Sequence, residues 1–298
     1  MMGKQTVAVV GLGQMGSAMA LNLREKGFDV MGWDIDPATR KRLASQGVTA
    51  GSTLAEALQG RAYVLSSLPN GACVRQSWLG KEGMIELADA GATLIDLSTI
   101  EPSAMREVAS RAVQRGLKVL DCPVSGGPVE ARAGRLIVMA GGEAAVLAQA
   151  RPLLEALGPT IRHTGEVGTA KVVKVINNTM AMGNLLVACE AFSLGEALGV
   201  DSATLFDVLS ESGGRSMTFT KRFPPALMGD FEPRFKLELA EKDLALGLSM
   251  ARELGVQVPA ATLVRSLFGQ ALEEGYGGKD AVALLAMYRD RVRRQAGK

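Results

Sequence analysis

Short apolar runs alternate with segments of helical periodicity throughout the first half of the chain. The runs are rich in β-branched residues and end in glycine, proline, aspartate or serine, which is typical of buried strands followed by turns. Strands are predicted at 6–10, 29–33, 62–68, 92–97, 117–120 and 136–140. Helical segments such as 17–26 and 102–115 lie between them and end before Gly27 and Gly116. The alternation predicts an α/β fold with a doubly wound sheet.

The second half reads as one helix after another and begins with a long segment, 165–198, that no proline interrupts. Apolar residues recur through it at helical spacing, which suits a long and largely buried helix. Further helices are predicted at about 201–209, 240–254, 260–274 and 279–294. The pattern therefore predicts a first domain at 1–164 and an all-helical second domain at 165–298, with the long helix as the hinge.

A glycine-rich turn follows the first predicted strand at once and opens the first helix. It reads Gly11-Leu12-Gly13-Gln14-Met15-Gly16. Gly11 permits the tight turn, Gly13 lets the backbone approach a pyrophosphate, and Gly16 lets the helix pack close to the strand. A pyrophosphate would sit on the helix N-terminus, where free N–H groups favour an anion. With a strand before it and a helix after it, the turn predicts dinucleotide binding.

The end of the second predicted strand carries Asp34, at about the distance of 20 residues from the glycines where a carboxylate binds the ribose hydroxyls. Its charge would repel a 2′-phosphate, so we expect NAD as the cofactor and consider NADP the less favoured choice. Arg40, Lys41 and Arg42 lie nearby, on the next predicted helix. We interpret them as a solvated face.

Two more predicted strands end in polar or turn residues at the edge of the sheet where ligands bind. Leu68, Pro69 and Asn70 close one strand, and Thr99 follows the next. These positions predict contacts with the dinucleotide, although ordinary loop residues would look the same.

A further loop, after the strand at 117–120, contains Ser125, Gly126 and Gly127. It offers a hydroxyl and exposed backbone N–H groups without bulky side chains, which suits a small carboxylate bound in an anion nest. A plain glycine turn is the alternative.

On the long helix, Lys174, Asn177 and Asn178 stand at i, i+3 and i+4, so they share one helical face. The trio predicts either a solvated stripe or a polar face turned to a cleft between the two domains. In the second domain, Arg215 and Arg222 leave two interpretations open: solvated surface, or contact with an acid group of the substrate.

The composition excludes several classes of function. Of the 298 residues, 47% are hydrophobic and 21% charged, and the net charge of +2 gives no reason to expect nucleic acid or an acidic membrane as a partner. We expect no signal peptide, no membrane span and a cytoplasmic protein with three reduced cysteines. His163 is the only histidine, so we expect no metal, and proton transfer falls to lysine, a carboxylate or tyrosine.

Four runs, in this order along the chain, resemble the β-hydroxyacid dehydrogenase family, which includes 3-hydroxyisobutyrate dehydrogenases and tartronate semialdehyde reductases. They are Gly11 to Leu23, Asp121 to Gly127, Gly165 to Asn178 and Glu241-Lys242-Asp243-Leu244. The resemblance implies a 6-phosphogluconate dehydrogenase-like fold. It has a dinucleotide-binding Rossmann domain at 1–164 and an all-helical substrate and oligomerisation domain at 165–298.

The resemblance also implies roles for individual residues. Lys174 matches the family's catalytic lysine, and Asn178 matches an amide that helps to hold the substrate, a task that Asn177 would share. Lys242 and Asp243 match a pair near the nicotinamide and the active lysine, which we assign to cofactor and substrate respectively. The remaining matches are the substrate loop Ser125, Gly126 and Gly127 and the cofactor contacts Pro69, Asn70 and Thr99.

The expected chemistry agrees with these roles. Oxidation of a hydroxyl needs a hydride acceptor, which NAD supplies, and a base. A lysine ammonium in water has a pKa of about 10.4, and a partly dry cleft lowers it because desolvation disfavours the charge. Lys174 is therefore predicted to take the hydroxyl proton in oxidation and to return it in reduction.

The leading hypothesis is an NAD-dependent dehydrogenase or reductase of a small 3-hydroxy acid, with 3-hydroxyisobutyrate or the tartronate semialdehyde/glycerate pair as foremost substrates. A sulfolactaldehyde-, serine- or threonate-specific enzyme stays open. An imine reductase of the same architecture is the nearest alternative, and Lys174 counts against it. The non-enzyme alternative is an NAD(P)-binding regulator. By analogy with the family, we expect a homodimer or homotetramer.

Overall fold

The computed structural model describes residues 5–296, and the chain divides into two compact units, one ending at Lys174 and the other beginning at Val175. The boundary falls inside α9 (Thr169–Ala197), a helix of 29 residues. The strands of the first unit are β1 (Thr6–Val10), β2 (Asp29–Trp33), β3 (Thr49–Ala50), β4 (Tyr63–Ser66), β5 (Thr93–Asp96), β6 (Lys118–Asp121), β7 (Val124–Ser125), β8 (Ile137–Gly141) and β9 (Thr160–Gly165). Its other helices are α1 (Gln14–Glu25), α2 (Pro37–Ser45), α3 (Leu54–Leu58), α4 (Gly71–Leu79), α5 (Met84–Leu87), α6 (Pro102–Gln114), α7 (Pro128–Arg132) and α8 (Ala144–Leu157).

The first unit is built on one sheet with the strand order β3-β2-β1-β4-β5-β6-β8-β7, and β9 pairs with β8. The strands from β3 to β6 are parallel to their neighbours, whereas β8 runs antiparallel to β6 and β7. The order reverses direction at β1, the switch point where ligands bind in sheets of this kind. The predicted doubly wound fold is confirmed.

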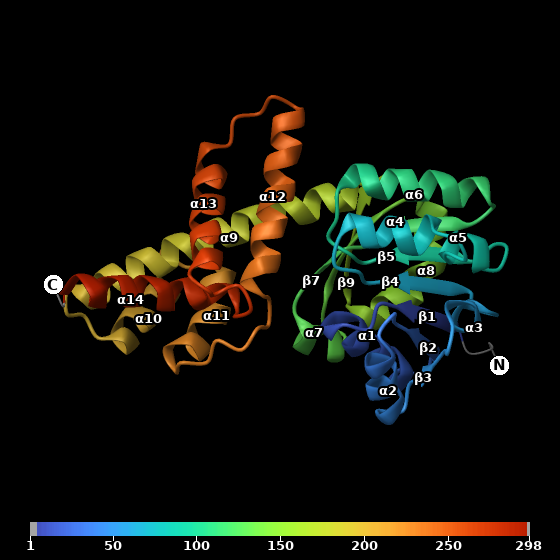
Figure 1. The fold of residues 1–298 in the computed structure, drawn as a ribbon, viewed down its shortest axis with the longest axis horizontal. Helices are drawn as coiled ribbons and strands as arrows, with labels where there is room; N and C mark the ends of the chain where they lie inside the picture. Colours follow the sequence, from blue (N-terminus) through green and yellow to red (C-terminus); the bar gives the residue numbers. More distant parts are fainter. Residues whose placement is uncertain (1–4, 297–298) are drawn as a thin grey trace. The chain divides into compact units, whose positions relative to one another are not determined.

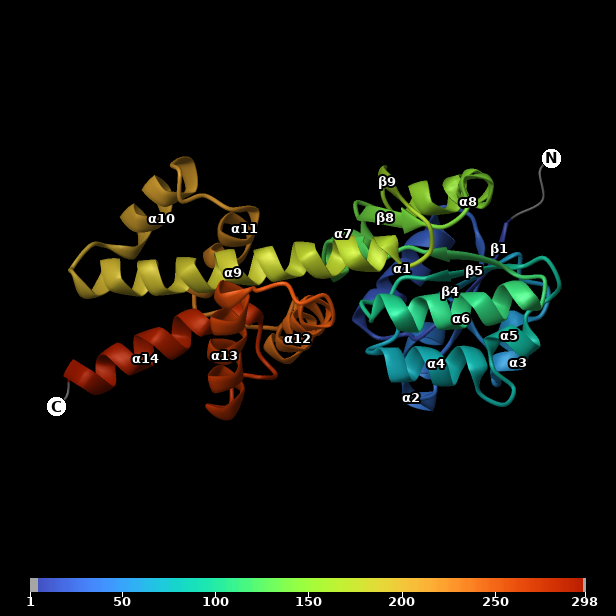
Figure 2. The same cartoon turned by 90° about the horizontal axis from the view of Figure 1, so that it is seen from above.

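Alternation along the strands supplies a core to each face of this sheet. In β1, Val7 and Val9 join the core formed with α1, α7 and α8, while Ala8 and Val10 join the core formed with α3 to α6. Figures 1 and 2 show α4 and α6 on one face of the sheet and α1 and α8 on the other. A strand buried on both faces has few polar side chains, which is why these runs stand out in the sequence.

The second unit is helical, as predicted. After the rest of α9 come α10 (Ser202–Glu211), α11 (Met217–Leu227), α12 (Leu237–Glu253), α13 (Pro259–Glu273), the 3₁₀ turn η1 (Ala281–Ala283) and α14 (Leu284–Ala296). One apolar core joins α9 to the other elements, with Phe192, Phe219 and Phe223 in mutual contact. In Figure 1, α12 and α13 lie side by side.

One helix of this unit was not predicted, because its sequence contains two prolines. Pro224 and Pro225 lie inside α11, near its end. Ser216 caps the helix by accepting a hydrogen bond from the N–H of Phe219 at 3.1 Å. Phe219 and Phe223, four residues apart, are both buried. Burial of this aromatic pair outweighs the lost proline hydrogen bonds, which fall in the last turns.

One helix bears on the expectation that the chain has no membrane span. Among the described residues, α9 is long and apolar enough, by length and composition, to cross a bilayer, and a third of its most apolar window is buried inside the protein. Its buried side supplies Leu185, Cys189 and Phe192 to the core of the second unit. The same test is passed by core helices that never meet a membrane.

Candidate active site

The glycine-rich turn has the geometry of a phosphate-binding loop. Gly11 has a φ of +87°, and a Cβ there would collide with the carbonyl of Ser67. A Cβ on Gly16 would collide with the carbonyl of Gly11, so the helix can approach the strand only without a side chain. Gly13 faces open space and is the N-cap of α1 without a side-chain cap. The space and the uncapped N–H groups fit a dinucleotide pyrophosphate.

Asp34 lies against this loop. One carboxylate oxygen accepts a hydrogen bond from the N–H of Leu12 at 2.7 Å, and the other accepts from the N–H of Asp36 at 2.9 Å. The Arg40 guanidinium donates to the backbone carbonyl of Asp34 at 3.2 Å and is half-buried. The solvated interpretation is therefore wrong for Arg40, whereas Lys41 and Arg42 are exposed.

The predicted cofactor contacts at the ends of β4 and β5 lie at the same edge of the sheet as the glycine loop, because β1, β4 and β5 are consecutive parallel neighbours. The N–H of Leu68 donates to the Ser98 hydroxyl at 2.9 Å, which ties the two strand ends together. Asn70 caps α4, since its side-chain oxygen accepts from the N–H of Cys73 at 2.8 Å. Pro69 and Asn70 are exposed and Thr99 is half-buried.

The predicted substrate loop connects β7 to α7. Ser125 ends β7 and pairs with Ile137, and Gly126 has a φ of +129° that strongly favours glycine. The N–H of Gly127 donates to the Glu130 carboxylate at 2.7 Å. The Gly127 N–H, one of the groups expected to bind a substrate carboxylate, is thus already hydrogen-bonded to the Glu130 side chain.

Lys174 is half-buried and closes the first unit, and Asn177 and Asn178 follow at the start of the second. In that unit, the Asn178 amide donates to the Asp243 carboxylate at 2.6 Å, and the Asn177 amide donates to the Asn178 oxygen at 3.0 Å. Lys242 Nζ lies 2.9 Å from the other oxygen of Asp243. The fold therefore brings two predicted pairs, Asn177-Asn178 and Lys242-Asp243, into one network with the buried Asp243 at its centre, although Asn178 and Asp243 are 65 positions apart in the sequence.

A buried charged cluster in the first unit was missed at the sequence level. The Lys171 side chain is fully buried, and its ammonium lies 2.8 Å from an oxygen of the equally buried Asp96. Asp121 is buried beside them, and burial raises the pKa of its carboxyl above the usual value although the charge of Lys171 opposes this. The available signal was Asp96, the one charged residue of the strand predicted at 92–97.

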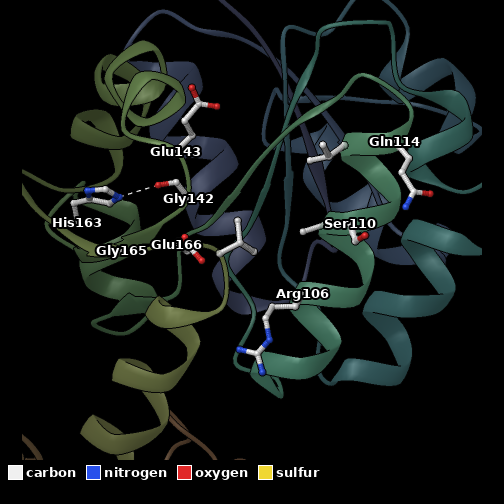
Figure 3. A pocket seen from close by; sticks show the side chains of 11 residues that line it. Arg106, Ser110, Gln114, Gly142, Glu143, His163, Gly165 and Glu166 are labelled. Atoms are coloured by element: carbon white, nitrogen blue, oxygen red, sulfur yellow. Dashed lines mark hydrogen bonds between the residues drawn. The ribbon is translucent and has the colours of Figure 1, made fainter.

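Arg222 and His163 have surroundings of their own. Arg222 forms a bidentate pair with the buried Asp280, with distances of 2.7 and 2.8 Å, so it serves the core of the second unit. His163 is exposed at a cavity of about 790 Å³ that α6 and the segments around Gly142 and Glu166 line, and its Nε2 lies 2.8 Å from the Gly142 carbonyl (Figure 3). None of the predicted site residues lines this cavity.

The fold and the glycine loop define a class, the dehydrogenases with a Rossmann-type domain and a helical second domain. Residues 6–165 match the family described as the NAD binding domain of 6-phosphogluconate dehydrogenase. Residues 168–288 match the family described as "NAD-binding of NADP-dependent 3-hydroxyisobutyrate dehydrogenase". The chain belongs to the 3-hydroxyisobutyrate dehydrogenase, or β-hydroxyacid dehydrogenase, family, and it is an NAD(P)-dependent oxidoreductase acting on CH–OH groups.

Individual relatives support this assignment over nearly the whole chain. A 3-hydroxyisobutyrate dehydrogenase of Pseudomonas aeruginosa is 36% identical over 294 residues, which cover 95% of this chain and 98% of the relative. The 3-hydroxyisobutyrate dehydrogenase of Mycobacterium tuberculosis with L-serine has a TM-score of 0.86 at 31% identity, covering 96% and 99%. An imine reductase from Pseudomonas sp. shares the fold, with a TM-score of 0.63 at 18% identity and coverage of 95% and 99%.

Proposed function

We propose that this enzyme uses NAD to interconvert a small 3-hydroxy acid and its semialdehyde or oxo acid, with Lys174 as general acid and base. The observation that carries the proposal is the network around Asp243. It fixes the Asn178 amide at 2.6 Å, and Asn178 stands one helical turn after Lys174 along α9. The two side chains suit two tasks: the Asn178 amide, held by Asp243, can hydrogen-bond a substrate hydroxyl, and the Lys174 amine can move the proton of that hydroxyl.

Oxidation removes a hydride from the carbinol carbon and a proton from its hydroxyl. The nicotinamide, when bound, supplies the hydride acceptor. The Lys174 amine takes the hydroxyl proton, and the resulting ammonium returns it to the carbonyl oxygen in reduction. Asn178, held by Asp243, orients the oxygen on which this proton moves.

The preference for NAD rests on the position of Asp34. Its carboxylate is fixed at the glycine loop by two backbone N–H groups, where a 2′-phosphate would meet its charge. Arg40 lies beside it and would be the natural partner of such a phosphate if the carboxylate were removed. The test is the ratio of kcat/KM for NAD to that for NADP, and a ratio below one would overturn the preference.

The carboxylate of the substrate is proposed to bind at Ser125, Gly126 and Gly127. For this, the Glu130 side chain has to release the N–H of Gly127, since the two are hydrogen-bonded here. Release of this contact would expose two consecutive glycine N–H groups and the Ser125 hydroxyl to an anion. A Ser125→Ala variant is expected to raise KM for the hydroxy acid more than KM for NAD.

The most specific part of the proposal is the identity of the substrate. Relatives over 92–95% of this chain act, by their names, on 3-hydroxyisobutyrate, 2-(hydroxymethyl)glutarate, 3-sulfolactaldehyde, L-serine and L-threonate. We place 3-hydroxyisobutyrate and the tartronate semialdehyde/glycerate pair first. The test is a screen of absorbance at 340 nm with NAD and NADP. These compounds and the named alternatives are assayed one by one, the hydroxy acids for oxidation and the aldehydes for reduction. Turnover of an imine with none of the hydroxy acids would favour imine reduction, and cofactor binding without turnover of any compound would favour a regulator.

We also propose that the enzyme is a homodimer or homotetramer. Val173, Ile176, Met180, Val187 and Leu194 are exposed and recur along α9 at spacings of three, four and seven residues. They form an apolar stripe on the helix, which burial against a second copy would remove from water. Light scattering on the purified protein tests this, and a monomer at micromolar concentration would contradict it.

A further inference from the structure

The ammonium group of Lys171 has a hydrogen-bond acceptor for each of its three N–H donors. Its side chain is fully buried, and Nζ donates to the Asp96 carboxylate at 2.8 Å, to the Asp96 carbonyl at 2.8 Å and to the Ser98 carbonyl at 2.9 Å. A lysine ammonium has three N–H donors and no acceptor, so each donor meets one acceptor.

Asp96 is satisfied with equal completeness. One oxygen accepts from Lys171 and from the N–H of Ser98 at 3.1 Å, and the other accepts from the hydroxyls of Ser66 at 2.6 Å and Ser98 at 3.0 Å. Behind it, the Trp78 indole donates to the Ser66 hydroxyl at 3.1 Å. A buried ion pair whose partners are fully hydrogen-bonded holds one geometry, and its contribution is to specificity more than to stability.

The cluster joins three segments of the first unit that carry predicted site residues. Its carbonyl acceptors, Asp96 and Ser98, lead into Thr99, and the Ser98 hydroxyl accepts from the N–H of Leu68 at the next strand end. The backbone N–H of Lys171 donates to the Asp121 carboxylate at 3.2 Å, at the start of the loop that leads to Ser125. Lys171 itself stands in the first turn of α9, one turn before Lys174.

We propose that Lys171 is a positioning residue, whose side chain pins the first turn of α9 to the end of β5 and so fixes the place of Lys174 relative to the cofactor loops. The inference rests on the proposed role of Lys174. Its physical basis is that a shift of about 1 Å in a reacting group can cost about 100-fold in rate. Without the ammonium, the hydrogen bond from the Lys171 backbone N–H to Asp121 remains, but the three contacts to Asp96 and Ser98 are lost.

The test compares Lys171→Met with the double variant Lys171→Met/Asp96→Asn. The single variant leaves a buried carboxylate unpaired and is expected to lose stability. The double variant removes both charges and is expected to recover much of that stability, but it lacks the tether to the two carbonyls. We expect kcat to fall by about 10- to 100-fold in both, with KM for NAD changed by less than about threefold. The matched control is Lys118→Met, since that ammonium donates to the Gln149 side chain away from the site.

The kinetic isotope effect of a substrate deuterated at the carbinol carbon separates positioning from stability. A misplaced Lys174 slows the chemical step, so the single-turnover rate falls and the isotope effect on kcat rises. A smaller folded fraction lowers kcat without changing either. If the double variant unfolds, hydrogen exchange in the single variant decides: relative to the Lys118→Met protein, exchange at 169–176 is expected to rise more than exchange in the strands of the same unit.

Wild-type kcat and isotope effect in the double variant, or unchanged hydrogen exchange in the single variant, would overturn the role of Lys171. That failure is separable from failure of the proposed function. If Lys174→Met kept wild-type turnover, the function assigned to Lys174 would fall first, and the role of Lys171 with it. If Lys174→Met were inactive and the double variant normal, only the present inference would fail.

Discussion

Asp243→Asn is the substitution that probes the network of the second unit most cleanly. It preserves the shape of the side chain and an oxygen that can accept from Asn178, but it removes the buried charge. A hydrogen bond to a charged group contributes about 1.5–3 kcal/mol. The ion pair with Lys242 adds less than about 1 kcal/mol, since the Lys242 side chain is 27% exposed and solvent screens it.

The variant keeps a neutral hydrogen bond worth about 0.5–1.5 kcal/mol, so the loss is about 1–1.5 kcal/mol, which corresponds to about a 5- to 13-fold fall in kcat/KM for the hydroxy acid. The effect should fall on the substrate and not on NAD, because Asp243 acts through Asn178. The assay is initial-rate kinetics at 340 nm with a parallel thermal melt. The neighbouring Glu241→Gln is the matched control, since Glu241 pairs with Arg265 at a partly exposed position.

The reasoning would be refuted by an Asp243→Asn protein that melts like wild type and keeps kcat/KM within about twofold. A fall of the same size in Glu241→Gln would also count against it, because it would indicate a general response of α12 to charge removal.

Three further predictions concern the cofactor, the core and pH. Asp34→Ser should raise kcat/KM for NADP relative to NAD by about tenfold or more, because Arg40 remains beside the ribose position; an unchanged ratio in the 340 nm assay would contradict this. Arg222→Met should destabilise the protein by about 3 kcal/mol in urea unfolding, because it leaves Asp280 buried and unpaired, while kcat of the folded enzyme stays the same. Asp121→Asn removes a carboxyl that titrates differently in the folded and unfolded states. Burial raises the pKa of this carboxyl, so the folded state binds its proton more readily than the unfolded state does. Wild type should therefore gain stability relative to this variant as pH falls from neutrality toward the unfolded pKa of about 3.9, and a melting difference independent of pH would contradict this.

The parts of the fold that the sequence predicted are those with a local cause. The glycine turn, Asp34 and the apolar strands each follow from a short-range requirement, such as a positive φ at Gly11 or burial on both faces of β1. The antiparallel β8 could not be predicted in this way, since its direction depends on pairing with β6 and not on its own composition.

The parts that the sequence did not predict depend on distant partners. In the sequence, Lys171 has no feature that distinguishes it from a surface lysine on a helix. Its role follows from the ion pair with Asp96, which is 75 positions away in the sequence. Arg222 looked like a free cation in a loop, but it lies on α11 and meets Asp280, 58 positions away. In both cases a buried carboxylate decides the role of a basic side chain, and only the fold brings the two together.

The most direct test of the whole account is the turnover of Lys174→Met on the hydroxy acid that the screen identifies, measured together with NADH binding by fluorescence. We predict a fall in kcat of at least about 100-fold, the size of a lost general acid–base, with the dissociation constant for NADH within about threefold of wild type. Wild-type turnover with normal NADH binding would contradict the central claim that Lys174 moves the proton.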